Sequence, residues 1–309
     1  MNPLVSVVIP AYNAADDLPR CLSALKGQSL PATDYQVIVV DDGSSDDTVA
    51  AAKPFAIDLI RQDNRGAPAA RNAGIAIARG TWVAFTDADC VPSRRWLEEL
   101  LRAVSARADS GGFVGAAGRT VGLNSNAQAA RFVDLAGGLD AERHLSHPKW
   151  PFAPTCNVLY RRSKLLAAGG FDERYCAYDA CDLHARVRPP AGAFPFVPRA
   201  VVLHKHRDSW AGYFRQQRGY GRGLAQFMLC HRDETPWSGS QELKAWGDLA
   251  GQLAMAIIPG KSDAWLLRRG QAVKSLAQRL GFTAVFWNRN ARQSWSEPMP
   301  DVVSSVHHV

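Results

Sequence analysis

Short apolar runs and amphipathic stretches alternate along the first 85 residues of the chain. The apolar runs are rich in β-branched residues and have the length of buried parallel strands. They are Leu4–Ile9, Tyr35–Val40, Ile57–Ile60 and Trp82–Phe85. The stretches between them carry apolar residues at helical spacing. This alternation predicts an α/β fold with a doubly wound, mostly parallel sheet.

The pattern changes character along the rest of the chain. Further strands are expected at Phe113–Gly118, Pro154–Tyr160 and Val197–His204, whereas residues 123–150 give no assignable pattern. Helical periodicity then dominates, and it predicts Trp210–Cys230, Glu242–Ile258 and Trp265–Leu280 as helices. We therefore expect an α/β domain over residues 1–225 and a helical C-terminal extension over 226–309, with a flexible tail from residue 288.

Composition narrows the class of protein. The chain has 309 residues, 47% of them hydrophobic, and a net charge of +7, so it can bury a large core. A basic chain can bind nucleic acid, an anionic membrane or a phosphate-rich small molecule. Nucleic acid is the least supported of the three and is not expected as a partner, because the sequence contains no Lys/Arg run of five and no zinc-finger or RNA-binding signature.

Cysteine spacing and hydropathy indicate the compartment. The six cysteines form no C-x-x-C pair, which indicates free thiols in a reducing compartment. No signal peptide and no run of ~18 apolar residues is recognisable. We therefore expect a cytoplasmic protein.

Acidic residues follow two of the expected strands. Asp87 and Asp89 come directly after Trp82–Phe85, and Asp41 follows the second strand. Ligands of open α/β sheets bind at the carboxyl edge of the strands, and Mg²⁺ and Mn²⁺ prefer oxygen ligands. Two carboxylates one residue apart can hold such an ion, although an isolated pair of this kind is more often a solvated turn.

Basic and acidic side chains elsewhere could complete a site for a phosphorylated ligand. Arg71 offers a fork of donors suited to a phosphate, or it is an ordinary arginine on a helix face. Lys205 and Arg218 are further candidates for phosphate contacts. His204 and His206 alternate on the last expected strand, so they should face opposite ways and only one should enter the site.

Several motifs occur together in the order typical of one family. They are Ser6-Val7-Val8-Ile9-Pro10-Ala11-Tyr12-Asn13, Val40-Asp41-Asp42-Gly43-Ser44, Arg71-Asn72-Ala73-Gly74, Asp87-Ala88-Asp89 and Gly169-Gly170-Phe171-Asp172. Over residues 4–225 the chain resembles the family 2 glycosyltransferases, which have the Rossmann-like GT-A fold. Each motif alone is weak, whereas the ordered set is specific.

The resemblance implies an inverting enzyme that moves a sugar from a nucleotide-diphosphate sugar, of the UDP type, to a glycan, a lipid-linked acceptor or another hydroxyl. About residues 1–118 would bind the nucleotide and 119–225 the acceptor. A divalent metal, Mn²⁺ or Mg²⁺, would be the cofactor. The resemblance also implies roles for individual residues: Pro10, Ala11 and Tyr12 line the base and ribose, Asp41 bonds the base, Arg71 supports the nucleotide, Asp87 contacts ribose, Asp89 and His204 approach the metal, and Asn157 lines the pocket.

One motif departs from the family pattern. The family usually has Glu-Asp-x-Asp-Leu with the second residue as catalytic base, whereas this chain has Asp179-Ala180-Cys181-Asp182-Leu183. Asp179 or Asp182 takes over as base, or the chain binds nucleotide-sugars with weak or lost transfer. A dinucleotide-dependent oxidoreductase is disfavoured because Pro10-Ala11-Tyr12-Asn13 stands where its G-x-G-x-x-G motif belongs.

The two C-terminal helices allow two interpretations. Their apolar residues recur at helical spacing with Lys and Arg among them. Both apolar faces could pack on the catalytic domain. Alternatively, the helices could associate peripherally with the anionic cytoplasmic face of a membrane, in a salt-sensitive way, where lipid-linked acceptors or growing surface polysaccharides would be within reach.

Overall fold

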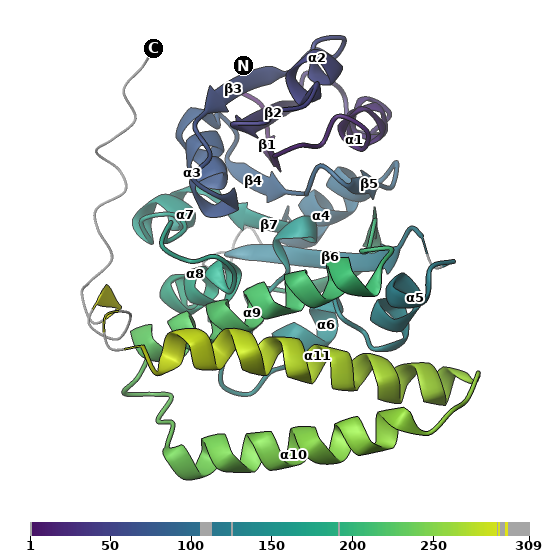
Figure 1. The fold of residues 1–309 in the computed structure, drawn as a ribbon. Coiled ribbons are helices and arrows are strands. Elements are labelled where there is room, and N and C mark those ends of the chain that lie inside the picture. The colour runs from purple at the N-terminus through teal and green to yellow at the C-terminus, as the bar shows by residue number, and fades with distance from the viewer. Residues whose placement is uncertain are drawn as a thin grey trace.

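A computed structural model describes residues 2–105, 113–124, 126–190, 192–288, 290 and 294–295. One eight-stranded sheet forms its centre, in the order β3-β2-β1-β4-β7-β6-β8-β5 (Figure 1). The strands are β1 (Val5–Ala11), β2 (Tyr35–Asp42), β3 (Asp58–Gln62), β4 (Trp82–Phe85), β5 (Cys90–Pro92), β6 (Gly115–Gly122), β7 (Val158–Arg161) and β8 (Phe196–His204).

The N-terminal half of the sheet is parallel throughout. β2 and β4 flank β1, with Ala11 opposite Asp41 and Val8 opposite Phe85, and β3 pairs with β2. Because the chain first winds outward to β3 and then crosses back to β4, the order reverses between β1 and β4. The doubly wound sheet is therefore confirmed, and this reversal is the point where such folds bind ligands.

Helices cover both faces of the sheet. Successive residues of β1 point to opposite faces, and both sets are buried. Val5, Val7 and Ile9 pack in one cluster with α1 and α4, whereas Val8 packs in another with α3 and α8. The helices of this domain are α1 (Leu18–Lys26), α2 (Thr48–Ala52), α3 (Ala67–Ile77), α4 (Trp96–Ser105), α5 (Gln128–Leu135), α6 (Ala141–Leu145), the short 3-10 turn η1 (Thr155–Asn157), α7 (Arg162–Ala167) and α8 (Asp179–Val187).

Two motifs that lie a hundred residues apart in the sequence are clamped together. The side-chain amide of Asn72 donates to the carbonyl O of Phe171 at 2.8 Å and accepts from its N–H at 2.8 Å. Gly170, at φ +72°, leaves no room for a Cβ beside the Asn72 oxygen. Asn72 thus fixes the loop that leads into α8 against α3.

Three long helices form a separate layer: α9 (Trp210–Cys230), α10 (Gly239–Ile257) and α11 (Asp263–Phe286). α9 and α11 lie side by side, and α10 runs along the outer side of α11 (Figure 1). The backbones of α9 and α11 touch where Gly221 faces Gln278 and Gly281 faces Arg218, positions with no space for a Cβ.

A buried carboxylate holds α10 in this layer. Glu242 Oε1 accepts from Trp246 Nε1 at 2.9 Å and Thr283 Oγ1 at 3.0 Å. Glu242 Oε2 accepts from Trp237 Nε1 at 3.1 Å and Arg279 at 2.8 Å. Both oxygens are therefore fully used, and the partners Arg279 and Thr283 belong to α11.

Two differences from the sequence-based expectation concern less regular segments. Residues 123–150, which gave no pattern, contain α5 and α6. Most of the tail that was expected to be flexible lies outside the described residues, but its Trp295 is buried with its ring 4.7 Å from that of Tyr175. Among the helices that the structure describes, none combines the length and apolar character needed to cross a membrane.

Candidate active site at the sheet edge

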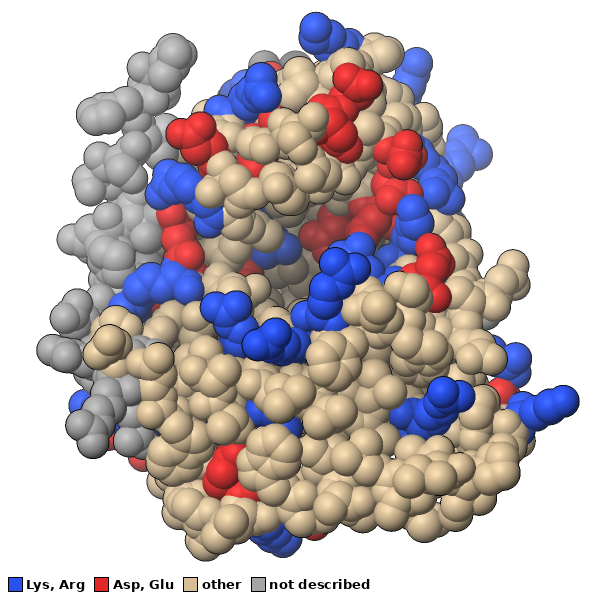
Figure 2. Space-filling model, in the orientation of Figure 1, with Lys and Arg blue, Asp and Glu red and all other residues tan. Residues whose placement is uncertain are grey.

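Carboxylates gather at the reversal point of the sheet. β4 ends at Phe85, and the chain then turns through Asp87 and Asp89 before β5 begins at Cys90. The Asp87 and Asp89 side chains are only 28% and 24% exposed. Figure 2 shows a hollow near the middle of this face, with acidic side chains inside it and Lys and Arg side chains along its lower rim. The arrangement suits a ligand that brings both a cation and anionic groups.

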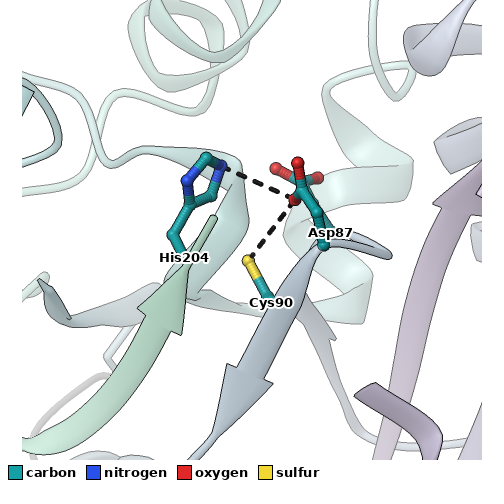
Figure 3. A group of neighbouring side chains, drawn as sticks. Asp87, Cys90 and His204 are labelled. Carbon is teal, nitrogen blue, oxygen red and sulfur yellow. Dashed lines mark hydrogen bonds and ion pairs between the residues drawn. The ribbon is translucent and has the colours of Figure 1, made fainter. Parts of the chain in front are cut away.

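Asp87, Cys90 and His204 converge at the sheet edge, as Figure 3 shows: Asp87 lies in the turn between β4 and β5, Cys90 is the first residue of β5, and His204 is the last residue of β8. Asp89 lies next to Cys90 in the same turn. His204 Nε2 lies 3.6 Å from Asp89 Oδ1, and Cys90 Sγ lies 4.0 Å from the same oxygen. With Asp87, their ligand atoms all lie within 4.8 Å of one another. Burial raises the pKa of Asp89, against the opposing effect of His204. Two carboxylates, an imidazole and a thiol so close together fit a divalent metal.

The two histidines do not face opposite ways, so that expectation was wrong. β8 ends at His204, and the chain leaves the strand, so His206 turns back and its Nδ1 lies 3.2 Å from Nδ1 of His204. His206 Nε2 is 3.2 Å from Asp134 Oδ1. A neutral imidazole has one donor and one acceptor nitrogen. These contacts are all hydrogen bonds when His204 donates from Nδ1 to Nδ1 of His206 and His206 donates from Nε2 to Asp134. Nε2 of His204 is then an acceptor beside Asp89.

Arg71 bridges two acids, Asp87 and Asp179. It is buried in α3, with one guanidinium nitrogen 2.8 Å from Asp179 Oδ2 and the other 3.3 Å from Asp87 Oδ1. Burial raises the pKa of the Asp179 carboxyl, and Arg71 opposes that rise. Asp179 is therefore a buried acid at the sheet edge whose charge depends on its arginine partner.

The second acid of α8 lies elsewhere. Asp182 Oδ2 is 2.7 Å from Arg186, and Oδ1 is 3.2 Å from His231 Nε2. Burial would raise the pKa of Asp182, but the hydrogen bonds and charges of His231 and Arg186 outweigh it and lower this pKa. Asp179 and Asp182 therefore have different partners, although they lie three residues apart on one helix.

The expected nucleotide-binding residues lie at the ends of β1 and β2. Pro10 and Ala11 end β1, and Tyr12 follows with 53% of its surface exposed. Asp41 is fully buried in β2, with Arg61 3.3 Å from its Oδ2, yet that oxygen has no hydrogen bond within the described residues. Ala11 pairs with Asp41, so an exposed ring follows directly after the strand position next to a buried carboxylate oxygen that lacks a hydrogen bond. Such an arrangement suits a planar, hydrogen-bonding ligand.

Other expected contacts are already used within the protein. Asn157 is 1% exposed; its amide accepts from Trp96 Nε1 and donates to two backbone carbonyl oxygens. Lys205 Nζ is 2.9 Å from Asp17. Arg218 is exposed on α9, where Arg215 and Arg222 lie on the same face. Asn157 and Lys205 therefore stabilise the surroundings of the hollow, whereas the α9 arginines stay exposed.

Sequence reasoning missed three contributors to this site. Cys90 adds its thiol, and its only signal was its position next to Asp89. The Asp134–His206 contact supports the His204 ring on the side away from Asp89. It could not be read from the sequence because it depends on the turn that follows β8. Tyr220 of α9 lies close to Asp87 and Asp179, and burial raises its pKa to about 12; nothing in its sequence context marks it.

Sequence comparisons agree on one family. The family model described as Glycosyl transferase family 2 matches residues 6–167. The pre-mycofactocin glycosyltransferase of Mycobacterium tuberculosis is 32% identical over 290 residues, which cover 85% of this chain and 58% of that protein. Glycosyltransferase AglE of Haloferax volcanii is 31% identical over 245 residues, covering 74% of this chain and 76% of AglE. The chain thus spans little more than half the length of the mycobacterial relative.

Solved structures confirm the GT-A fold. The mannosyltransferase PcManGT from Pyrobaculum calidifontis, in complex with GDP-Man and Mn²⁺, has a TM-score of 0.66 at 20% identity, covering 94% of this chain and 88% of PcManGT. S. aureus TarS in complex with UDP-GlcNAc has a TM-score of 0.54 at 16% identity, covering 91% and 90% of the two chains. Both complexes hold a nucleotide-sugar on this fold.

Proposed function

The chain belongs to glycosyl transferase family 2 and is a glycosyltransferase, and we propose that it moves a sugar from a nucleotide-diphosphate sugar to a hydroxyl acceptor with inversion. The observation that carries this proposal is the meeting of Arg71, Asp87, Asp89, Asp179 and His204 at the reversal point of the sheet. The donor is proposed to be a UDP-sugar and the acceptor a glycan or a lipid-linked sugar. GDP-sugars belong in the test because one structural neighbour binds GDP-Man.

Asp89 and His204 would hold a Mn²⁺ or Mg²⁺ ion, with Asp87 and Cys90 beside it. When bound, such an ion supplies Lewis-acid stabilisation to a leaving diphosphate. The residues themselves arrange the donor: the ends of β1 and β2 bind the nucleoside, and Asp87 is placed for the ribose. Asp134 and His206 hold the His204 ring so that Nε2 faces Asp89.

Asp179 is the proposed general base. It is the acid of α8 that shares Arg71 with Asp87, and its raised pKa brings it closer to neutral pH, where a base takes a proton most effectively. Arg71 fixes the orientation of its carboxylate. Asp182 is a poorer candidate because both its oxygens are occupied by Arg186 and His231.

A donor-hydrolysis screen across UDP- and GDP-sugars, with Mn²⁺ or Mg²⁺, tests the proposal. Asp179→Asn should lower turnover about 100-fold or more while donor affinity, measured by calorimetry, stays within a factor of three. Loss of turnover in Asp182→Asn but not in Asp179→Asn would move the role to Asp182. Donor binding without turnover, together with strong activation by Ala180→Asp, would indicate that the native chain transfers weakly.

We also propose that α10 lies on an anionic membrane surface. Leu243 and Ile257 are 76% and 81% exposed, and the helix has no charged residue after Asp248. The lower face of the molecule, where α10 lies, is largely free of charge (Figure 2). Exposed Lys261, Arg268 and Arg269 follow the apolar end of the helix. An apolar face beside basic residues suits the interface of an anionic leaflet.

Flotation with anionic and neutral liposomes tests this surface. Binding should require anionic lipid, weaken with salt and be lost in Ile257→Glu. Leu166→Glu, an exposed leucine 41% accessible on α7, is the matched control and should leave binding unchanged. Equal flotation of the two variants, or none for the unaltered chain at low salt, would show that α10 only covers α11.

A further inference from the structure

A second group of metal-ligand side chains lies away from the sheet edge, where α8 meets the carboxyl end of α9. Asp182, Cys230 and His231 each offer one ligand atom, and all three atoms lie within 4.8 Å of one another. His231 Nε2 is 3.2 Å from Asp182 Oδ1. Tetrahedral zinc, with bonds of about 2.0–2.3 Å, places neighbouring ligand atoms roughly 3.3–3.6 Å apart. The Asp182–His231 pair is therefore close to the spacing that zinc requires, and the Cys230 sulfur lies within 4.8 Å of both atoms.

The surroundings leave suitable lone pairs and orient the histidine ring. Arg186 occupies Oδ2 of Asp182 and leaves Oδ1 on the side of His231. The His231 ring packs against Trp150 and Phe227, with ring centroids 5.1 and 4.5 Å away. Such outer contacts are typical of partners that orient metal ligands.

A buried hydroxyl lies beside this group. Tyr175 is 2% exposed, and its hydroxyl is a hydrogen-bonding neighbour of the Cys230 thiol. This contact falls outside the geometry of an ordinary hydrogen bond, which leaves the hydroxyl available to a water on a metal held by Cys230.

The chemistry of the donors selects the kind of ion. A carboxylate and a thiolate together balance a charge of +2, and the carboxyl end of the 21-residue α9 favours a cation. Sulfur, imidazole nitrogen and a single oxygen form a softer set than Mg²⁺ or Ca²⁺ prefers and suit Zn²⁺.

We propose that Asp182, Cys230 and His231 form a zinc site that ties α8 to the end of α9, with the Tyr175 hydroxyl beside the fourth position. α8 begins at Asp179, which reaches the sheet edge. The zinc site thus holds the helix that carries the candidate base. Its existence does not depend on which sugar the enzyme transfers or on whether transfer is efficient.

Cobalt substitution tests the site without an activity assay. Metal-free chain is titrated with Co²⁺, and the thiolate-to-cobalt charge-transfer absorption is recorded. Because Cys90 can contribute a thiolate at the sheet edge, the titration is made in Cys90→Ser, where the band should appear, and it should disappear when Cys230→Ser is added to that variant. Cys176→Ser, a surface cysteine, is the matched control and should keep the band. No band in Cys90→Ser, or a band that persists when both Cys90 and Cys230 are replaced, overturns the proposal.

Alkylation of the unaltered chain keeps the proposal testable if Cys230→Ser does not fold. Mass spectrometry follows the rate at which iodoacetamide modifies each cysteine. Zn²⁺ should slow modification of Cys230 at least tenfold and leave the rate at Cys176 unchanged. In Asp182→Asn, the Zn²⁺ concentration needed to protect Cys230 should rise tenfold or more. Equal rates at Cys230 with and without Zn²⁺ would mean that Asp182 and His231 form only an ion pair.

Discussion

The sheet edge and the helical layer use buried carboxylates in opposite ways. Glu242 in α10 accepts four hydrogen bonds, two on each oxygen, from residues of α10, α11 and the loop before them. Asp89 at the sheet edge has a histidine nitrogen at 3.6 Å and a thiol at 4.0 Å, both beyond ordinary hydrogen-bond length. One carboxylate is saturated by its own protein, whereas the other keeps lone pairs for a ligand.

This difference explains why the two regions can be altered separately. A saturated buried carboxylate contributes to stability, because removing it leaves its donors without partners. An incompletely bonded carboxylate contributes little to folding and much to binding. Mutations at the sheet edge should therefore change chemistry with little loss of stability, and mutations at Glu242 should do the reverse.

The sharpest test of the sheet edge is Asp89→Asn. A neutral amide is a poorer ligand for a hard divalent ion, so turnover should fall about 100-fold or more and the dependence on Mn²⁺ concentration should flatten. The midpoint of thermal unfolding should stay within about two degrees. Asp63→Asn, on an exposed loop, is the control and should change neither. Full activity in Asp89→Asn would remove this residue from the metal site.

The matching test of the helical layer is Glu242→Ala. Breaking a buried, hydrogen-bonded ion pair costs about 3–5 kcal/mol, and here it should release α10 from α11. Amide hydrogen exchange across α10 should become much faster, while donor binding measured by calorimetry stays unchanged. Asp248→Ala, an exposed acid on the same helix, should leave exchange as it is. Slow exchange in Glu242→Ala would show that apolar packing alone holds α10.

Acidification should destabilise the sheet domain through a buried histidine. Burial lowers the pKa of His184 to about 4, and its Nδ1 lies 3.1 Å from the Tyr160 hydroxyl. Below pH 6.5 the unfolded chain binds the extra proton and the folded chain does not, so stability falls as pH drops towards 4. Between pH 7.5 and 5 this residue should account for about 2 kcal/mol of lost unfolding free energy.

Denaturant titrations at the two pH values measure that loss. His184→Gln should be less stable than the unaltered chain at pH 7.5 but should lose about 2 kcal/mol less on acidification. An identical pH dependence in both proteins would show that other groups control acid sensitivity.

The smallest expected effect concerns the support behind the metal ligand. His206→Phe removes the contact that orients His204 without touching Asp89. Mn²⁺ affinity of the donor-free protein, measured by electron paramagnetic resonance, should fall about tenfold. His147→Phe, at an exposed position, serves as the control. Unchanged affinity in His206→Phe would mean that Asp89 and its neighbours hold the ring alone.

The sequence was informative where function depends on local order. Strand ends and the acids that follow them are neighbours in the chain, so the positions of Asp41, Asp87 and Asp89 could be predicted. The histidine geometry could not, because it depends on where β8 ends. Glu242 gave no signal, since its partners Arg279 and Thr283 come from another helix. The helix α5 was missed because Phe132 finds its partners on α9 and α11.

The Asn72 clamp limits which substitutions the chain can accept during evolution. Asn72 bonds both the N–H and the carbonyl of Phe171, and a side chain at Gly170 would collide with the Asn72 amide. Substitutions in the two motifs therefore affect each other. A substitution at position 72 removes the steric need for glycine at 170, although the positive φ there still favours glycine, and a side chain at 170 displaces the amide. Gly170→Ala should therefore cost less stability in an Asn72→Ala background than in the unaltered chain, but it should remain destabilising in both.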